Sequence, residues 1–201
     1  ATMQAVLSYC GKPFQVGYGA SWVMAYGSQN VHRYQYLELG SRWLARCDVP
    51  DLQLFPARYG VTERVCFEAG LEVTITPFLL WLIAALVRIG VVRDVFAFAY
   101  PQVLQRYGTW FDALGTGTRG MHIGITGTGH DGRAARLDWH LVAKRGHGPE
   151  MPCIAAIVIA RGLAAGRMAA RGAMPCMGLM ALAQFAEEVS NLDIEWRAVW
   201  G

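Results

Sequence analysis

The sequence predicts an α+β fold in which a mostly antiparallel, mixed sheet is covered by helices on one face. Segments that alternate between apolar and polar residues, as strands do, are interspersed with segments that have helical apolar spacing. The clearest alternating pair, 121–127 and 134–145, is joined by a short turn rich in glycine, which is typical of an antiparallel hairpin. Hydrophobic residues make up 54% of the 201 residues, enough for the core of a single domain over 1–201.

The remaining elements follow from apolar spacing and from residues that begin or end helices and strands. Gly19 lies at the turn of an early hairpin, Pro50 follows a helical turn, and Pro101 begins a helix. The predicted elements are the end of a helix at 5–10, a hairpin of 13–18 with 21–26, a helical turn at 41–47, a strand at 64–73, helices at 101–114, 151–166 and 181–189, and a closing strand at 193–199.

One apolar segment, TPFLLWLIAALVRIG (76–90), raises the question of a membrane span. Thr76 suits an N-cap, Pro77 the first helical position and Gly90 a helix end. The helix between them has about 13 residues and a length of roughly 20 Å, shorter than the hydrocarbon core of about 30 Å. A helix that is apolar on every side is typical of a core or a subunit interface, so we expect it to be buried, with peripheral membrane contact as the alternative.

The alternation of the main hairpin separates two faces. The face expected in the core carries Met121, Ile123, Ile125, Leu137, Trp139, Leu141 and Ala143. If the turn centres on Asp131, His122 lies opposite His140 on the other face, which Asp138 shares. Two histidines and an aspartate suggest a metal site, but zinc sites use three or more ligands. We therefore expect no metal and a polar face that is solvated or covered by a partner.

Two glycine patterns match GxGxxG, the fingerprint of dinucleotide binding. GTGTRG (115–120) precedes a strand, and GTGHDG (127–132) is the tip of the hairpin. The fingerprint requires a strand, a glycine turn and then a helix, whose N-terminus receives the pyrophosphate. Neither pattern has that context, so we expect no cofactor-binding residues in this chain.

Charge and cysteine content exclude two further classes. The net charge of +3 is spread along the chain without a basic tract, so no nucleic-acid partner is expected. The five cysteines lie far apart and form no CxxC pair, which is typical of reduced thiols in a cytoplasmic protein. No secretory signal is visible at the start of the chain.

The segment RGHGPEMPC (145–153) connects a predicted strand to a predicted helix. Gly146 and Gly148 allow an unusual backbone turn, and the prolines fit the start of the helix. Its N-terminal amides attract negative charge, which Glu150 would satisfy as a cap. Alternatively, Arg145, His147 and the amides form one wall of a site for an anionic ligand. From the residues alone, capping is the favoured interpretation.

The segments RGHGPEMPCIAAIVIARGLAAG and RGAMPCMGLMALAQFAEEVSNLDI resemble the end of bacterial saccharopine dehydrogenase-like oxidoreductases. Similarity extends to VLSYCGKPFQV, RWLARCDVPDLQLFPARYGV, FEAGLE and GMHIGITG, and so to nearly the whole chain. The resemblance implies an NAD(P)-dependent parent protein with an N-terminal Rossmann domain. This chain would be the second domain, which lacks the Rossmann domain, contacts an unknown substrate and forms a homodimer.

The resemblance also implies the site and the chemistry. Hydride transfer would use a nicotinamide held by the Rossmann domain, so this chain would be catalytically incomplete alone. The substrate-binding residues would be Arg145, Gly146, His147, Gly148 and Glu150. No catalytic residue is assigned. Two alternatives remain open: a non-catalytic ligand-binding or interaction domain on the same scaffold, and, with least support, a metal enzyme using His122 and His140.

Overall fold

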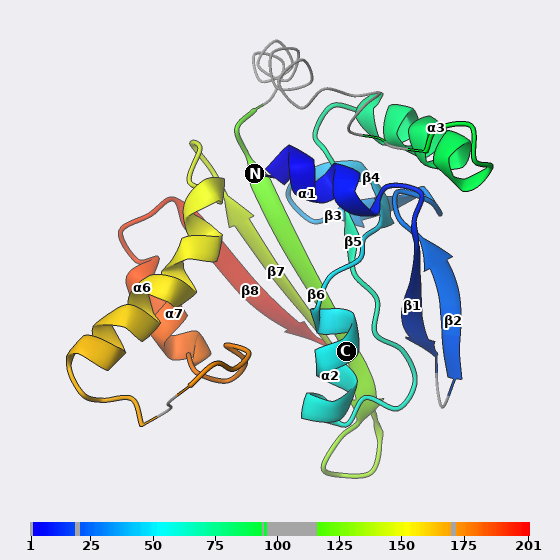
Figure 1. Cartoon of the computed structure of the whole chain (residues 1–201). Coiled ribbons are helices and arrows are strands. Elements are labelled where there is room, and N and C mark those ends of the chain that lie inside the picture. Colours follow the sequence, from blue (N-terminus) through cyan, green and yellow to red (C-terminus); the bar gives the residue numbers. More distant parts are fainter. Residues whose placement is uncertain (1, 19–20, 94, 96–115, 170–171) are drawn as a thin grey trace. The chain divides into compact units, whose positions relative to one another are not determined.

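A computed structural model describes residues 2–18, 21–93, 95, 116–169 and 172–201 (Figure 1). The chain divides into two compact units, 1–35 with 40–115 and Tyr36–Leu39 with Thr116–Gly201. Helices and antiparallel strand pairs both occur, so the fold is α+β as predicted. Within the described residues, however, the strands form three sheets rather than the one mostly antiparallel sheet expected from the sequence.

The first unit holds two small sheets and three of the described helices. Its elements are α1 (Thr2–Tyr9), β1 (Pro13–Tyr18), β2 (Ser21–Tyr26), β3 (His32–Tyr36), β4 (Gly40–Arg46), α2 (Asp51–Tyr59), β5 (Glu68–Ala69) and α3 (Thr76–Arg88). Strands β1 and β2 pair antiparallel, which confirms the early hairpin. Val16 and Leu52 are almost fully buried where β1 packs against α2.

Several sequence-based predictions for this unit are wrong. Residues 41–47, predicted as a helical turn, form β4, because pairing with β3 and β5 outweighs the weak local preference for helix. The strand predicted at 64–73 is reduced to the two residues of β5, and β3 and α2 are elements that the analysis did not predict. The helix predicted at 101–114 lies outside the described residues.

The apolar segment forms the predicted helix, α3, but it is not buried within this chain, since Phe78, Leu79, Trp81 and Leu82 are exposed. Its start also differs in detail. Thr76 is the first helical residue rather than the N-cap, a position held by Ile75, which makes no side-chain cap bond. One face packs Leu80, Ile83 and Val87 against the buried Leu7 of α1. No helix among the described residues has both the length and the apolar character needed to cross a bilayer.

The second unit contains the hairpin and the segment that follows it (Figure 1). Its elements are β6 (Arg119–Thr128), β7 (Ala134–Ala143), the 3₁₀ helix η1 (Gly148–Glu150), α6 (Met151–Ala164), α7 (Leu182–Glu188) and β8 (Ile194–Trp200). The sheet order is β6-β7-β8 with antiparallel pairs throughout. The register places His122 opposite His140, as predicted.

Helices cover one face of this sheet over β7 and β8. Trp139, Leu141 and Ala143 of β7 are buried against Ile154 of α6 and Val189 after α7. The same face of β6 is not part of this core. Met121, Ile123 and Ile125 are exposed, so the expectation that all three lie in the core is wrong. The reason is position, since β6 is the edge strand farthest from β8.

A short turn from the first half of the sequence also belongs to the second unit. Tyr36–Leu39 connects β3 to β4 and clusters with the β6-β7-β8 sheet. Leu39 packs on Gly120, where a β-carbon would lie 2.3 Å from the Leu39 Cδ1 atom. Glycine at this position therefore leaves the space that the leucine side chain occupies.

Candidate functional site

The segment between β7 and α6 turns through two residues in the left-handed backbone region. Arg145 has a φ of 51° and Gly146 a φ of 83°. Glycine adopts such values at no steric cost, whereas a residue with a β-carbon does so rarely. The unusual turn predicted from the sequence is therefore present, and we call residues 145–150 the elbow. The left-handed residues are Arg145 and Gly146, not Gly146 and Gly148.

Backbone hydrogen bonds hold this elbow against both neighbouring strands. The Gly146 N–H donates to the Gly117 carbonyl at 3.2 Å, just before β6. The Lys144 N–H donates to the Asp193 carbonyl at 2.8 Å, just before β8. The His147 N–H donates back to the Lys144 carbonyl at 3.1 Å. The polar backbone groups of the elbow are thus anchored to the ends of the three-stranded sheet.

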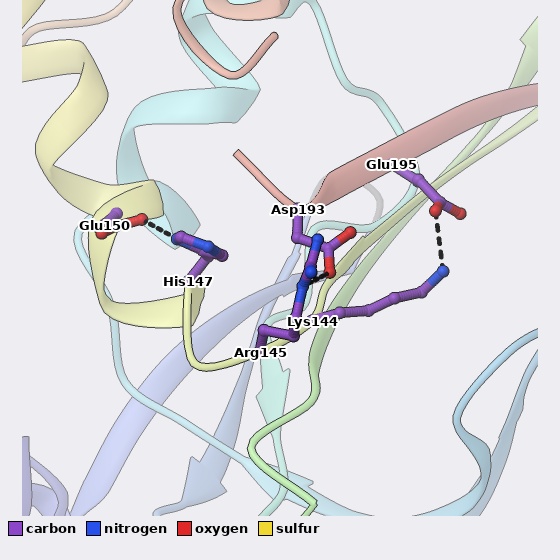
Figure 2. Close-up of polar contacts among 6 residues, drawn as sticks. All are labelled: Lys144, Arg145, His147, Glu150, Asp193 and Glu195. Carbon is purple, nitrogen blue, oxygen red and sulfur yellow. Dashed lines mark hydrogen bonds and ion pairs between the residues drawn. The ribbon is translucent and has the colours of Figure 1, made fainter. Parts of the chain in front are cut away.

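Each of the three basic side chains at the elbow has a carboxylate partner (Figure 2). The Arg145 Nε atom lies 2.5 Å from Asp193 Oδ2, and the Lys144 Nζ atom lies 2.8 Å from Glu195 Oε1. Hydrogen bonding to Glu195 raises the pKa of Lys144. The His147 Nδ1 atom lies 2.6 Å from Glu150 Oε2. Each pair has at least one exposed side chain, so solvent weakens the attraction between its two charges.

The favoured interpretation of Glu150 as a helix cap is wrong. Glu150 is the N-cap residue of α6, but its side chain makes no cap hydrogen bond and instead binds His147. Pro149 and Pro152 do fit the first turns of η1 and α6, as expected. The amides at the helix start therefore still attract an anion, although the negative charge of Glu150 opposes part of that attraction.

The structure adds one residue to the elbow that sequence reasoning missed, Arg119. A β-carbon on the buried Gly148 would lie 2.1 Å from the Arg119 Cδ atom, so the arginine stem lies directly on this glycine. Arg119 is exposed and forms no hydrogen bond or ion pair with another described residue. The register that pairs His122 with His140 also pairs Arg119 with Ala143, two residues before Arg145. The predicted β6–β7 register could therefore have identified Arg119 as a neighbour of the elbow.

The elbow can bind but has no evident catalytic group. Arg119 provides unpaired guanidinium donors, and the helix start adds partial positive charge. Arg145 uses Nε for Asp193 and His147 uses Nδ1 for Glu150, so a ligand can contact the other nitrogen atoms of these side chains or compete for their carboxylate partners. The arrangement is suited to a carboxylate or a similar anion, held mainly by Arg119.

A second polar cluster lies on the open face of the sheet. The rings of His122 and His140 stack with centroids 4.7 Å apart and planes 28° apart. His122 Nε2 lies 2.8 Å from Asp138 Oδ1, and Arg136 binds the same carboxylate through Nε at 2.5 Å. Gly124, opposite Asp138, leaves room for this diagonal contact, since a β-carbon there would lie 3.3 Å from the His122 ring.

The electrostatics of this cluster follow from its contacts. Hydrogen bonds from Arg136 and then His122 lower the pKa of Asp138 to about 2. Burial, and then the neighbouring His122, lower the pKa of His140 below its ordinary value of 6.5. The described residues contain no group of three or more histidine, cysteine or acidic side chains placed to hold a metal ion. The structure thus brings the two histidines together without a third ligand.

A cavity of about 150 Å³ adjoins this cluster within the second unit. Its walls come from the polar face of the sheet and from the β3–β4 turn. The charged or titratable side chains that line it are Tyr36, Glu38, His140, Glu195 and Arg197.

The two GxGxxG patterns lie where the sequence analysis predicted. The described part of GTGTRG leads directly into β6, and GTGHDG forms the end of β6 and the turn to β7. Neither is followed by a helix, so no glycine turn delivers a phosphate to a helix N-terminus here.

Comparison with known proteins adds no relative. No protein-family model matches the chain, and no curated protein matches it.

Proposed function

We propose that this chain is the substrate-binding and dimerisation domain of a cytoplasmic NAD(P)-dependent oxidoreductase similar to saccharopine dehydrogenase-like proteins. In this proposal the Rossmann domain of the parent protein binds NAD(P) and supplies the hydride, while the elbow at 145–150 binds the substrate. The chain alone is catalytically incomplete.

The observation that carries the proposal is the open guanidinium of Arg119 beside the start of α6. A cation without a partner among the described residues, next to a helix N-terminus, favours binding of a carboxylate or another small anion. Arg145 and His147 line the same elbow and extend the site once a ligand competes with Asp193 and Glu150.

The architecture of the second unit supports the same proposal. An antiparallel sheet with helices packed over one face, and with its opposite face polar, is the arrangement that the family resemblance implies. The hairpin context of both glycine patterns agrees with a division of labour in which another domain holds the cofactor.

A second candidate is a non-catalytic ligand-binding or interaction domain on the same scaffold. The observation that favours it is the internal pairing of Arg145 and His147, which engages both side chains with carboxylates of this chain. Addition of the parent's NAD(P)-binding domain separates the two: substrate-dependent oxidation of NAD(P)H supports the oxidoreductase, and anion binding without turnover supports the second candidate.

The elbow itself is tested by titrating the chain with inorganic phosphate and with succinate while following backbone amide shifts by NMR. We expect the amides around Gly146 and Gly148 to shift, and Arg119→Gln to weaken binding by roughly 10- to 100-fold, because one charge-assisted hydrogen bond contributes about 1.5–3 kcal/mol.

The matched control is Arg133→Gln, at the far tip of the hairpin, where the side chain is 88% exposed. This variant should titrate like the wild type. If Arg119→Gln also titrates like the wild type, Arg119 is not the anion-binding group and the proposed site is wrong.

A further inference from the structure

Strand β6 is an open edge of the three-stranded sheet. It pairs with β7 on one side, and no described strand pairs with its other side. Its ten residues pair with β7 in continuous register, so no bulge twists the edge away. From Gly120 to Thr128 it contains no proline, lysine or acidic residue. It therefore lacks the features by which proteins prevent an edge strand from pairing further.

One face of the same strand is apolar and uncovered. The exposed fractions of Met121, Ile123 and Ile125 are 41%, 44% and 56%. These side chains share a face with Leu141 and Trp139 of β7, which the helices bury. An exposed apolar strand with free backbone groups favours pairing with another chain.

The opposite edge of the sheet differs in its side chains. Strand β8 carries Glu195 and Arg197 on alternate positions, and Lys144 binds Glu195 across from β7. Charged residues along an edge disfavour uncontrolled pairing. The edge that remains to be covered is therefore β6.

The sequence of β6 is complementary to itself in the antiparallel direction. A two-fold axis at Ile123 places Ile123 beside its own copy and Met121 beside Ile125 of the second chain. The same axis places His122 opposite Gly124, and Arg119 opposite Gly127. Arg119 and His122 then each lie opposite a glycine, so neither side chain lies opposite the same residue of the second chain. Like charges directly opposite one another would be destabilising, and this register avoids them.

We propose that two copies of this chain pair through antiparallel β6 strands about a two-fold axis at Ile123, forming a continuous six-stranded sheet. The backbone pairing satisfies the free edge, and the apolar side chains of the two copies form one contiguous patch. This interface rests on the dimerisation part of the proposed function, and it does not depend on the anion site at the elbow.

Complementary charges at the axis test the interface. Ile123→Lys and Ile123→Glu each place two like charges side by side in the dimer, and each should raise the dimer dissociation constant by at least about 100-fold. Mixing the two variants should restore association as a heterodimer, because lysine then faces glutamate. Sedimentation at micromolar concentration measures all three samples.

The matched control is Ile157→Lys on α6, where isoleucine is 42% exposed. It should sediment like the wild type. A monomeric wild type would overturn both dimerisation and the interface. A dimeric wild type whose state is unchanged by both Ile123 variants would overturn the interface alone.

Hydrogen exchange of the wild type provides a second test that needs no variant. Amides of β6 that point away from β7 should exchange more slowly as the protein concentration rises, whereas amides of β8 should not change. Exchange in β6 that is independent of concentration, in a sample that sediments as a dimer, would contradict pairing through this edge.

Discussion

At the scale of single residues, the elbow combines an uncommon backbone with an uncommon close approach. Arg145 occupies the left-handed region, which costs of the order of 1–3 kcal/mol for a residue with a side chain. Its ion pair with Asp193 and the anchored amide of Gly146 stabilise that conformation. The Arg119 side chain packs against Gly148, 29 residues later in the sequence, in the space that a β-carbon there would occupy. The position of the Arg119 guanidinium thus depends on the absence of a side chain at Gly148.

Replacing Gly148 with alanine should therefore displace Arg119. We expect Gly148→Ala to lower the free energy of unfolding by about 1–3 kcal/mol, because the new β-carbon overlaps the arginine stem. Thermal and urea unfolding followed by circular dichroism measure the change.

Gly127→Ala in β6 is the control, because nothing lies within 4 Å of a β-carbon there and its φ is ordinary. It should leave stability unchanged or raise it by up to about 1 kcal/mol. Equal melting temperatures for the two variants would contradict the close approach at Gly148.

At the scale of secondary-structure elements, the β6–β7 hairpin was the most predictable part of the chain. Strict alternation and a turn centred near Asp131 define its register, and with it the pairing of His122 with His140. Strand β3 was not predicted, because in HRYQY only two tyrosines alternate with polar residues, and no aliphatic residue strengthens the pattern. Helix α2 contains Pro56 within it, a residue that usually ends a helix. The exposure of Met121, Ile123 and Ile125 could not be predicted, because the alternation of apolar residues does not show whether another element covers that face of β6.

The histidine pair predicts a dependence of stability on pH. The pKa of His140 is lower in the folded chain than its ordinary value of 6.5, so the unfolded chain binds the proton preferentially. Stability should therefore fall as the pH decreases below about 6.5 toward about 5. In His140→Gln the melting temperature should change less with pH over this window than in the wild type. The charged and titratable neighbours of His140 are unchanged in this variant; they are Glu38, Arg197, Asp138 and His122.

A second, more acidic window belongs to Asp138. Its pKa falls from 3.8 to about 2 on folding, so its contribution is present at neutral pH and is lost as the pH falls through that interval. Asp138→Asn should remove this acidic slope and leave the upper window intact. Profiles for His140→Gln that run parallel to the wild type between about pH 7 and 5 would refute the assignment of the upper window.

At the scale of the whole molecule, neither GxGxxG pattern lies between a strand and a helix within the described residues, as dinucleotide binding requires. The residues of the proposed anion site, the stacked histidines and the β6 edge all belong to the second unit. The first unit contributes its own small sheets and the apolar helix α3. The proposed substrate binding and the proposed pairing of copies therefore concern the same unit, and in this proposal another domain supplies the cofactor chemistry.

The isolated chain should not bind the nicotinamide cofactors. Titration of NADH and NADPH fluorescence should show no saturable change, because both glycine patterns lead into strands or turns. A nucleotide-binding dehydrogenase under the same conditions serves as the positive control. Saturable binding at micromolar concentration would contradict the proposed division between this chain and a cofactor-binding domain.

The turn Tyr36–Leu39 has a consequence for how the chain can be divided or exchanged. Because this turn belongs to the second unit, the chain passes between the units at 35–36, at 39–40 and at 115–116. No single cut separates two complete units. A fragment that begins at Thr116 leaves Leu39 behind and exposes the surface around Gly120. In a chain recombined at the same boundary, a residue larger than glycine at position 120 requires the Leu39 side chain to move, so the fit between these two residues depends on both parental sequences.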